Sequence, residues 1–591
     1  MKQWDGRIAY CRHGGRQRRL RFIEKMSAVC AALGLTMVGA MAQEDPGKLP
    51  PTDVRPTPER RDTMNEPNQT SLATTSSVRR PGAHRLVLCN DGGTLAAPDA
   101  EAPLGVAGLV RSTIDPLRDT MVDTLYWQLG TDPYWGTPIH RLTEWYSHQT
   151  RIGARWGEGM ERFNTASEWR VFETTRDLIA QGTDPVAVIV DEGHKAGLAV
   201  YLSFRINDMH DSNLPGGLND PYMSPLKRQH PDWLIDEKGY GNRFAWNFAV
   251  PEVRRYKLDL MEEAINQYDL DGLNLDFCRW PKLFKAGAEQ SGMPLLTEMV
   301  RSLRQTLDAR GRALGRVLGL TVRVPGSIAN CRQAGIDVAG WIREGLVSAV
   351  IVGEVHGWHY RLPIEEYKAL ADGPGCLILA QNLCAFKEGR PRSAYVLFGE
   401  KTYYSVEQFR AQAARHWQAG ADGMFLWNQH FLPFHADSRF DRQSWKEVGD
   451  PAVLARKDKH YLVGPAGRGG CLPLELRPSV TTPVTIEIAD DLAAAERDGA
   501  LRTVTLRLLI EQMTGPDRIE YTLNGVSLDP ASAIRRINYN DTWLDFDVRH
   551  ALRNGVNGLT LTVRERNPRV ALPLVLRSVE VLVGYGASVQ N

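Results

Sequence analysis

The sequence predicts a (β/α)8 barrel followed by a smaller β-sandwich. Between residues 84 and 428, eight apolar strand candidates alternate with helical stretches, and repeated strand–helix units imply parallel strands with right-handed crossovers. A count of eight such units suits a closed barrel with enlarged loops. After about residue 472 the helical pattern stops and only strand-like runs remain.

Strand candidates are short Val-, Leu- and Ile-rich runs. They are Leu86–Asp91, Val122–Gln128, Leu198–Asn207, Gly272–Cys278, Leu318–Val324, Ala349–Glu354, Leu377–Gln381 and Gly423–Asn428. An open α/β sheet would instead need a glycine-rich phosphate turn after its first strand. Asn90-Asp91-Gly92-Gly93-Thr94 resembles such a turn only superficially, so the barrel is favoured.

Helix candidates fill the intervals between these strands. They are Trp169–Ala180, Val186–Ala196, Pro251–Tyr268, Leu295–Ala309, Val338–Glu344, Ile364–Ala371 and Val406–Ala419. Pro251 suits a first helical turn. Gly197, Gly345 and Gly420 stand where a helix would end before the next strand, as C-terminal caps.

The C-terminal region, residues 472–591, reads as a sandwich of six main strands. They are Val484–Ile488, Arg502–Leu509, Arg518–Leu523, Trp543–Val548, Leu559–Val563 and Leu576–Val583. Asn524-Gly525 is a hairpin turn signal. The run from Leu544 to Leu561 resembles the jelly-roll domains appended to many carbohydrate-active enzymes, and whether this region binds sugar is left open.

The N-terminus predicts export. Basic residues from Arg16 to Lys25 precede an apolar run, Met26 to Ala40, which ends in Ala40-Met41-Ala42. This order is typical of a secretory signal cleaved after Ala42, and the run is short for a membrane anchor. We therefore expect residues 1–42 to be a signal peptide, 43–80 a Pro/Ser/Thr-rich disordered linker and 81–460 the barrel domain, with the protein periplasmic or extracellular.

Composition excludes several other classes. Apolar residues make up 43% and charged residues 24% of the 591, and the formal net charge is +1, so we expect no nucleic-acid surface. We also expect no integral membrane segment after signal cleavage. The cysteines beyond the signal lack paired zinc spacing and read as structural, so neither a metal nor a cofactor is predicted. The oligomeric state is left open.

One stretch concentrates the candidate chemistry: Asp269 to Pro281. With period 2, Leu273, Leu275 and Phe277 fall on one face of a strand, and Asn274, Asp276 and Cys278 on the other. In a barrel the first face meets the helices, while the polar face lines the lumen near the catalytic mouth. A purely structural alternative is that Asp276 only caps the loop that follows the strand.

Polar or aromatic residues also end, or follow, the other candidate strands. Carboxylates, amides and aromatic rings suit a sugar, which presents apolar ring faces and many hydroxyls. Glycoside cleavage needs two carboxyl groups, and Asp276 and Glu354 are the natural pair, unless Glu354 serves only as a salt-bridge partner of Arg323. The candidate substrate-binding residues are Tyr126, Gln128, Trp135, Arg205, Asn207, Asp208, His210, Asp211, Asn274, Arg279, Trp280, Arg323, His356, Gln381, Asn382, Trp427 and Asn428.

A family resemblance follows from the same stretch. Asp271-Gly272-Leu273-Asn274-Leu275-Asp276-Phe277-Cys278-Arg279-Trp280-Pro281 resembles the strand-four signature of the glycosyl hydrolase-like ten group of bacterial (β/α)8 proteins. Asp271, Gly272, Asp276, Arg279 and Pro281 match its pattern. The resemblance implies polysaccharide hydrolysis with Asp276 at the functional position. We therefore expect a secreted glycoside hydrolase acting on a poly- or oligosaccharide.

Departures from related signatures keep alternatives open. The stretch also resembles the chitinase signature, but Cys278 stands where the catalytic Glu should be. A non-catalytic glycan-binding barrel is therefore a second hypothesis. A third is a metal-dependent hydrolase using histidines and Asp211. Its histidines, His210, His356, His359, His430 and His435, do not follow the H-E-x-x-H spacing.

Overall fold

The computed structural model describes residues 83–96, 105–129, 144–237, 243–278, 280–354, 361–371, 373, 375–382, 385–386, 402–403, 405–427, 429, 442–464 and 470–586. All of these residues belong to one compact unit, residues 76–591. The predicted signal peptide and linker lie outside the described residues.

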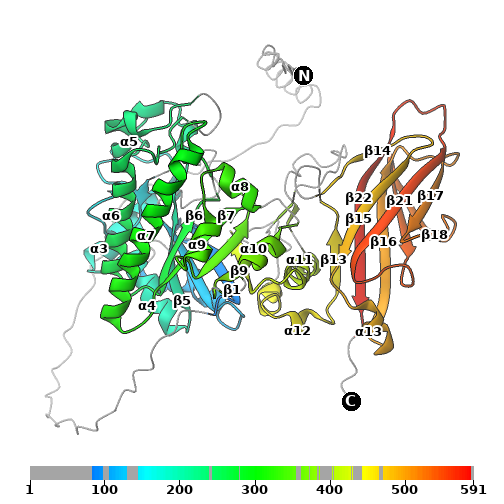
Figure 1. The fold of residues 1–591 in the computed structure, drawn as a ribbon, viewed down its shortest axis with the longest axis horizontal. Helices are drawn as coiled ribbons and strands as arrows, with labels where there is room; N and C mark the ends of the chain where they lie inside the picture. Colours follow the sequence, from blue (N-terminus) through cyan, green and yellow to red (C-terminus); the bar gives the residue numbers. More distant parts are fainter. Residues whose placement is uncertain are drawn as a thin grey trace, which may run out of the picture. The chain divides into compact units, whose positions relative to one another are not determined.

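Eight parallel strands close into a barrel, which confirms the predicted fold (Figure 1). Their order around the barrel is β1-β12-β9-β8-β7-β6-β5-β2, so sequence neighbours pair and the last strand closes on the first. The strands are β1 (Leu86–Asn90), β2 (Thr124–Leu129), β5 (Ala199–Arg205), β6 (Gly272–Asp276), β7 (Gly319–Pro325), β8 (Ala349–Gly353), β9 (Leu377–Asn382) and β12 (Gly423–Trp427). Each of the eight predicted strands corresponds to one of these.

Helices lie between the strands and cover the barrel. They are α2 (Val106–Thr113), α3 (Ala166–Ala180), α4 (Pro185–Lys195), α5 (Pro225–Gln229), α6 (Pro251–Gln267), α7 (Glu289–Leu314), α8 (Ile328–Gln333), α9 (Val338–Arg343), α10 (Ile364–Ala371), α11 (Val406–Gln418) and α12 (Pro451–Leu454). Pro251 opens α6 as predicted. Gly197, Gly345 and Gly420 follow α4, α9 and α11 with φ of 81°, 66° and 92°, the left-handed geometry that favours glycine.

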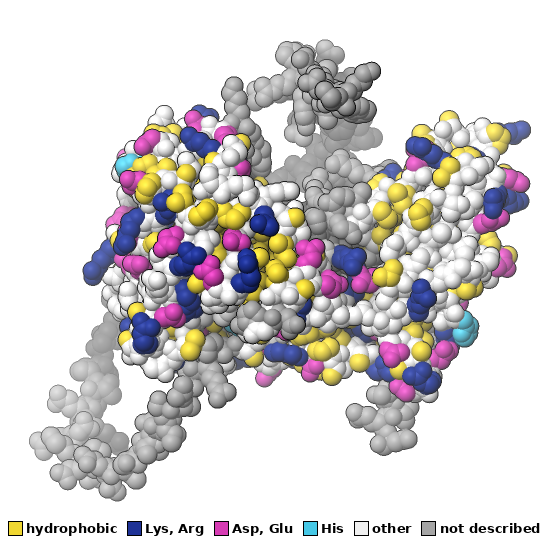
Figure 2. All heavy atoms as spheres, viewed as in Figure 1, with side chains coloured by type: hydrophobic (Ala, Val, Ile, Leu, Met, Phe, Trp, Pro, Cys, Tyr) yellow, Lys and Arg dark blue, Asp and Glu magenta, His cyan; other side chains and the backbone are white. Residues whose placement is uncertain are grey.

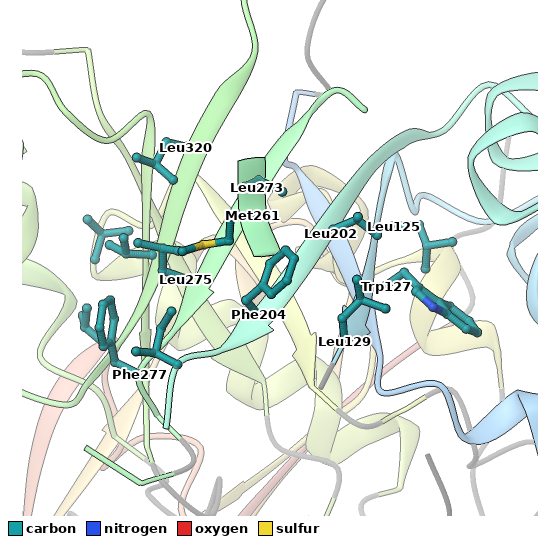
Figure 3. Packing of buried hydrophobic residues seen from close by; sticks show 14 of the residues in the cluster. Leu125, Trp127, Leu129, Leu202, Phe204, Met261, Leu273, Leu275, Phe277 and Leu320 are labelled. Carbon is teal, nitrogen blue, oxygen red and sulfur yellow. The ribbon is translucent and has the colours of Figure 1, made fainter. Parts of the chain in front are cut away.

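Strand alternation divides the barrel core into two apolar clusters. Outward residues of β5 and β6 pack in the larger cluster between the sheet and the helices (Figure 3). Figure 3 shows Leu202, Phe204, Leu273 and Leu275 there with Met261 of α6. The inward residues form a separate cluster in the lumen, which includes Cys89, Tyr126, Tyr201, Ile351, Leu379, Phe425 and Trp427. The predicted faces of the central strand are therefore correct.

The C-terminal region is an antiparallel β-sandwich, as predicted. One sheet has the order β13-β22-β16-β20-β19, with β14 also on β22, and the other has the order β15-β21-β17-β18. Apolar residues from both sheets share one core. The elements are β13 (Lys459–Leu462), β14 (Leu474–Leu476), β15 (Thr481–Ile488), α13 (Leu492–Arg497), β16 (Leu501–Glu511), β17 (Arg518–Leu523), β18 (Val526–Leu528), β19 (Ile534–Asn538), β20 (Asp541–Asp547), β21 (Gly555–Glu565) and β22 (Leu574–Tyr585).

The predicted hairpin turn joins β17 to β18. Asn524 and Gly525 have φ of 52° and 84°, as a tight two-residue turn between antiparallel strands requires. Two short strand pairs complete the fold: β3 (Trp145–Tyr146) with β4 (Ala154–Arg155), and β10 (Ala385–Phe386) with β11 (Thr402–Tyr403).

The surface carries charges of both signs. Figure 2 shows Lys and Arg side chains interspersed with Asp and Glu over the visible face, in keeping with the balanced composition. Within the described part of the chain, no helix has the length and apolar character needed to cross a membrane.

Candidate active site at the barrel mouth

Asp276 ends β6 and is the centre of a buried hydrogen-bond network. Arg323 Nη1, on the neighbouring strand β7, donates to both carboxylate oxygens of Asp276, at 3.0 and 2.9 Å. Gln128 Nε2 of β2 donates to Oδ2 at 3.1 Å, and the backbone N–H of Cys278 donates to Oδ1 at 2.9 Å. Only 3% of Asp276 is exposed, so this carboxylate is held in one orientation.

Arg323 extends this network to three further strands. Its Nε donates to Gln381 Oε1 of β9 at 2.9 Å, and its Nη2 donates to the backbone carbonyl of Glu354, just after β8, at 3.2 Å. Its guanidinium carbon lies 4.8 Å from the centre of the Trp427 ring on β12, a cation–π arrangement. Arg323 is completely buried and pairs with Asp276, its neighbour in the β6–β7 register. Arg323 thus contacts Glu354 through the backbone carbonyl of that residue.

Glu354 is the more accessible of the two predicted catalytic carboxylates, since it is half-buried. Its Oε1 lies over Gly326, where an added Cβ would come within 2.2 Å of it. Burial raises the pKa of the Cys278 thiol well above its usual value, and the charges of Asp276 and Glu354 raise it further. Both carboxylates therefore lie within electrostatic range of this one thiol.

Tyr126 and Asn274 lie deeper in the barrel than the Asp276 network. Tyr126 OH of β2 donates across the lumen to Thr321 Oγ1 of β7 at 2.9 Å. Thr321 in turn donates to Asn274 Oδ1 at 3.0 Å, and Asn274 Nδ2 donates to Ser203 Oγ at 2.8 Å. Tyr126 and Asn274 are both completely buried. This layer supports the floor of the mouth and gives Tyr126 and Asn274 no surface for a ligand.

The loop after β5 contains a group of buried charges. Arg205 Nη1 donates to Asp208 Oδ2 at 2.9 Å, and the backbone N–H of His210 donates to Asp208 Oδ1 at 2.9 Å. Lys227 Nζ donates to Asp211 Oδ2 at 2.6 Å, with neither side chain exposed. Burial raises the pKa of Asp211 to about 6, although Lys227 opposes the shift.

A further pair supports this group from the chain before α3 and from α6. Glu144 accepts an ion-pair contact from Lys257 and a hydrogen bond from Tyr146 OH at 2.9 Å. Burial lowers the pKa of Lys257, and the charge of Glu144 opposes that shift. Neither residue was suggested by the sequence, because nothing in its pattern links positions 144 and 257.

Asn207 holds the loop together. Its Oδ1 accepts from the Trp246 backbone N–H at 2.9 Å, and its Nδ2 donates to the Trp246 carbonyl at 2.9 Å and to the carbonyl of Lys282. The side-chain amide of Asn207 therefore serves to hold this loop in place. Trp280 is half-buried beside the small cluster of Met209, Ile235 and Ala245, with its ring centre 6.3 Å from that of His210.

Strand alternation separates Gln381 from Asn382. Gln381 lies on the same face of β9 as Leu379, which points into the lumen. Asn382 lies on the same face as Ala380, which points towards the helices. Four other predicted residues, Trp135, Arg279, His356 and Asn428, lie outside the described residues, as do His359, His430 and His435. Within the described ranges, no three His, Cys, Asp or Glu side chains are grouped as metal ligands would be.

Asp91 was missed as a site residue. It directly follows β1 and is 2% exposed. By strand alternation it lies on the same inward face as Val87 and Cys89. Burial alone would lower the pKa of Arg205, but the charges of Asp208, Asp91 and Asp276 raise it. Asp91 therefore lies among the mouth charges. The available signal was strand parity, since Asp91 was the last residue of a predicted strand.

A match to a protein family covers the segment that contains β5, β6 and the loop between them. Residues 156–291 match the family described as Glycosyl hydrolase-like 10. The resemblance predicted from Asp271–Pro281 is thereby confirmed.

Curated relatives match over a similar length. Glycosyl hydrolase YngK of Bacillus subtilis (strain 168) is 31% identical over 103 residues, which are 17% of this chain and 19% of YngK. Glycosyl hydrolase DigH of Escherichia coli (strain K12) is 28% identical over 102 residues, which are 16% of this chain and 22% of DigH. The chain thus matches roughly a fifth of the length of these relatives.

Similar solved structures include the PgaB (BpsB) glycoside hydrolase domain from Bordetella bronchiseptica. It is 13% identical with a TM-score of 0.36, over 62% of this chain and 99% of that chain. The noncanonic maltogenic α-amylase AmyB from Thermotoga neapolitana is 10% identical with a TM-score of 0.35, over 85% of this chain and 99% of that chain. The barrel itself is established by the strand order.

Proposed function

We propose that this protein is a glycoside hydrolase that acts on a poly- or oligosaccharide at the carboxyl ends of its barrel strands. The observation that carries the proposal is the fixed carboxylate of Asp276, which accepts hydrogen bonds from Arg323, Gln128 and Cys278 at the end of β6. Glu354 is half-buried and joins the same network through its backbone carbonyl, which accepts from Arg323. The family match at residues 156–291 supports this reaction class.

The two carboxylates have different surroundings, which favour different roles. Glu354, as the more accessible acid, donates its proton to the leaving glycosidic oxygen as the bond to the anomeric carbon breaks. Asp276, held as an oriented anion by Arg323, faces the positive charge that develops on the sugar. Water then adds to the anomeric carbon and returns one proton to a carboxylate. Gln128, Gln381 and Trp427 line the same network and contact the sugar.

A glycan-binding barrel without catalysis is the second candidate. It is favoured by the four hydrogen bonds that Asp276 accepts, because a carboxylate so fully occupied is well suited to a structural ion pair. In that case the mouth holds a sugar but does not cleave it.

Substitution of both carboxylates separates these two functions. The purified protein is assayed for new reducing ends on a panel of plant, algal and bacterial glycans, together with Asp276→Asn and Glu354→Gln. We expect each variant to lose at least about 100-fold in kcat on the glycan that wild type cleaves. Asp422→Asn is the matched control, since Asp422 precedes β12 at the opposite end of the barrel, bonded to Lys368. Binding without cleavage by wild type would favour the second candidate.

We also propose that the protein is exported and that residues 1–42 are removed. The basic segment, apolar run and Ala40-Met41-Ala42 site support this. N-terminal sequencing of the protein from the producing cell should begin at Gln43. An intact N-terminus on cytoplasmic protein would contradict export.

A further inference from the structure

An aromatic cluster connects the interior of the barrel domain to its surface at the start of α3. It begins at Trp145, which is 5% exposed, and continues to Trp156, which is 2% exposed, with 5.8 Å between the ring centres. The ring centre of Phe163 lies 5.6 Å from that of Trp156 and 5.4 Å from that of Trp169. Trp169 is 41% exposed, so the cluster ends in an indole ring that is open to solvent.

The exposed ring rests on a fixed support. Phe163 and Phe172 are stacked, with ring centres 5.2 Å apart, and both contact Trp169. Gly157 leaves room for this pair, since an added Cβ would come within 2.8 Å of Phe163 and still closer to Phe172. Glu168 Oε2 accepts from the two backbone N–H groups that directly follow Phe163, which fixes the loop. A ring that is already immobilised loses little conformational entropy when a ligand covers it.

The cluster is built from the segments that follow two barrel strands. Trp156 and Phe163 belong to the segment between β2 and α3, and Tyr222 belongs to the segment between β5 and α6. Tyr222 OH donates to Glu168 Oε2 at 3.1 Å, and the Tyr222 ring centre lies 5.8 Å from that of Trp156. Segments that follow the strands of a (β/α)8 barrel build its catalytic face. The support of Trp169 is therefore joined to segments that extend from the mouth.

The surroundings of Trp169 suit a sugar ring better than a protein partner. Its charged neighbours on α3 include Arg170, Glu173 and Arg176. The guanidinium carbon of Arg176 lies 5.8 Å from the ring centre of Trp169 and 5.7 Å from that of Phe172. A single open ring among charges is far smaller than the roughly 800 Å² that each partner buries in a stable protein interface. A pyranose matches it, because one face of the sugar presents C–H groups and its edge carries hydroxyls.

We propose that Trp169, supported by Phe163 and Phe172, is a surface platform that stacks on a pyranose ring of a polysaccharide outside the catalytic mouth. The side chain of Arg176, which is 46% exposed, donates to hydroxyls at the edge of the stacked ring. This inference rests on the proposed function, because it assigns a second contact with the polymer that the mouth cleaves. A polymer that occupies both places gains affinity over a disaccharide that occupies the mouth alone.

Native electrophoresis in gels that contain mixed-linkage β-glucan, galactomannan or xylan tests the platform. Wild type is expected to be retarded by at least one of these polymers. Trp169→Leu keeps an apolar side chain but removes the ring, so its dissociation constant for that polymer should be about 10-fold higher. Trp169→Phe keeps an aromatic ring and should bind within about threefold of wild type. Ile152→Ala, at a 43% exposed position in the segment before α3, is the matched control and should bind within about twofold of wild type.

Retardation of Trp169→Leu equal to that of wild type, or no retardation of wild type by any of the polymers, would overturn the platform. An equal loss of binding in Ile152→Ala or in Trp169→Phe would also overturn it, because the loss would then not depend on stacking at residue 169. The reducing-end assay on the same polymers separates this inference from the hydrolase proposal. Retardation that depends on Trp169 without any cleavage would support the platform while the hydrolase proposal fails. Cleavage without such retardation would refute the platform alone.

Discussion

At the scale of single residues, the mouth depends on one ion pair and on the space around it. Arg323 joins Asp276 to Gln381, and this contact is possible because residue 353 is glycine. A Cβ at position 353 would lie 2.2 Å from Gln381 Oε1 and 3.2 Å from Arg323 Nε. The missing side chain at Gly353 therefore leaves room for the amide of Gln381. This amide orients the guanidinium of Arg323, which in turn orients the carboxylate of Asp276.

Gly353→Ala is expected to displace Gln381 and to reorient Arg323. Overpacking of this kind costs about 1–3 kcal/mol of unfolding free energy, and glycan cleavage should fall more than stability predicts because Asp276 loses its fixed partner. Urea unfolding and the reducing-end assay measure the two effects. Gly558→Ala in β21 is the matched control, since nothing lies within 4 Å of its added Cβ. Equal effects of both substitutions would contradict this role of Gly353.

At the scale of elements, the loop after β5 is held on the barrel by buried ion pairs. Asp208 pairs with Arg205 at the end of the strand, and Asp211 pairs with Lys227 of α5. The amine of Lys227 also lies 5.4 Å from the ring centre of Trp246, which belongs to the same long segment between β5 and α6. An ion pair with no exposed surface fixes the loop but leaves a costly charge when one partner is removed.

Lys227→Met should therefore destabilise the protein by about 3–5 kcal/mol at pH 7, because the buried carboxylate of Asp211 loses the cation that it pairs with. Burial already raises the pKa of Asp211 to about 6, and loss of Lys227 raises it further. When folding raises the pKa of a carboxyl group, the free energy of unfolding of the protein falls as the pH rises. The fall begins at the unfolded pKa of the group, near 3.8, and ends above its folded pKa. The deficit of Lys227→Met should thus be smaller at pH 5 than at pH 7.

Urea unfolding followed by tryptophan fluorescence at both pH values measures this deficit. The double variant Asp211→Asn/Lys227→Met is the control, since it removes the charge together with its partner and should recover much of the stability. A deficit that does not change with pH would show that Lys227 acts through packing alone.

At the scale of the whole molecule, several buried histidines connect folding to pH. Burial lowers the pKa of His84 to about 4 and that of His416 to about 3, and it also lowers the pKa of His148. His84 lies two residues before β1, with its ring centre 5.1 Å from that of Tyr201, and His416 lies in α11. Burial in the core therefore disfavours the charged form of these rings.

Stability should accordingly fall as pH is lowered from about 6.5 towards 4. A histidine whose pKa is depressed on folding contributes stability above its unfolded pKa, near 6.5, and loses it as pH falls through the folded pKa, because the unfolded chain binds the proton first. Thermal unfolding from pH 7 to 5, above the range in which most carboxylates titrate, measures the slope. His416→Leu should make the slope shallower, whereas His550→Leu, at an exposed position, should not change it. Equal slopes in all three proteins would contradict the role of the buried rings.

Local sequence patterns by themselves determined most of the fold. The eight barrel strands, seven of the helices and the sandwich could be predicted because each follows from local alternation of apolar residues, from glycine caps or from the Asn524-Gly525 turn, all of which act within a few residues. Helices α2, α5, α8 and α12 were not predicted. Parity along a strand also placed Asp276, Arg323, Gln128 and Trp427 in the lumen. Asp271–Pro281 further indicated the family later matched at residues 156–291.

Only the tertiary structure decided what those residues do within the barrel. It places Tyr126 and Asn274 a layer too deep to reach a ligand, commits Asn207 to bracing a loop, and adds Asp91, Glu144 and Lys227 to the charges around the mouth. The depth of a side chain in the lumen depends on the register between neighbouring strands. Its hydrogen-bond partners depend on contacts between residues that are far apart in the chain. Local sequence patterns contain no information on either, because the closure of the barrel fixes both at once.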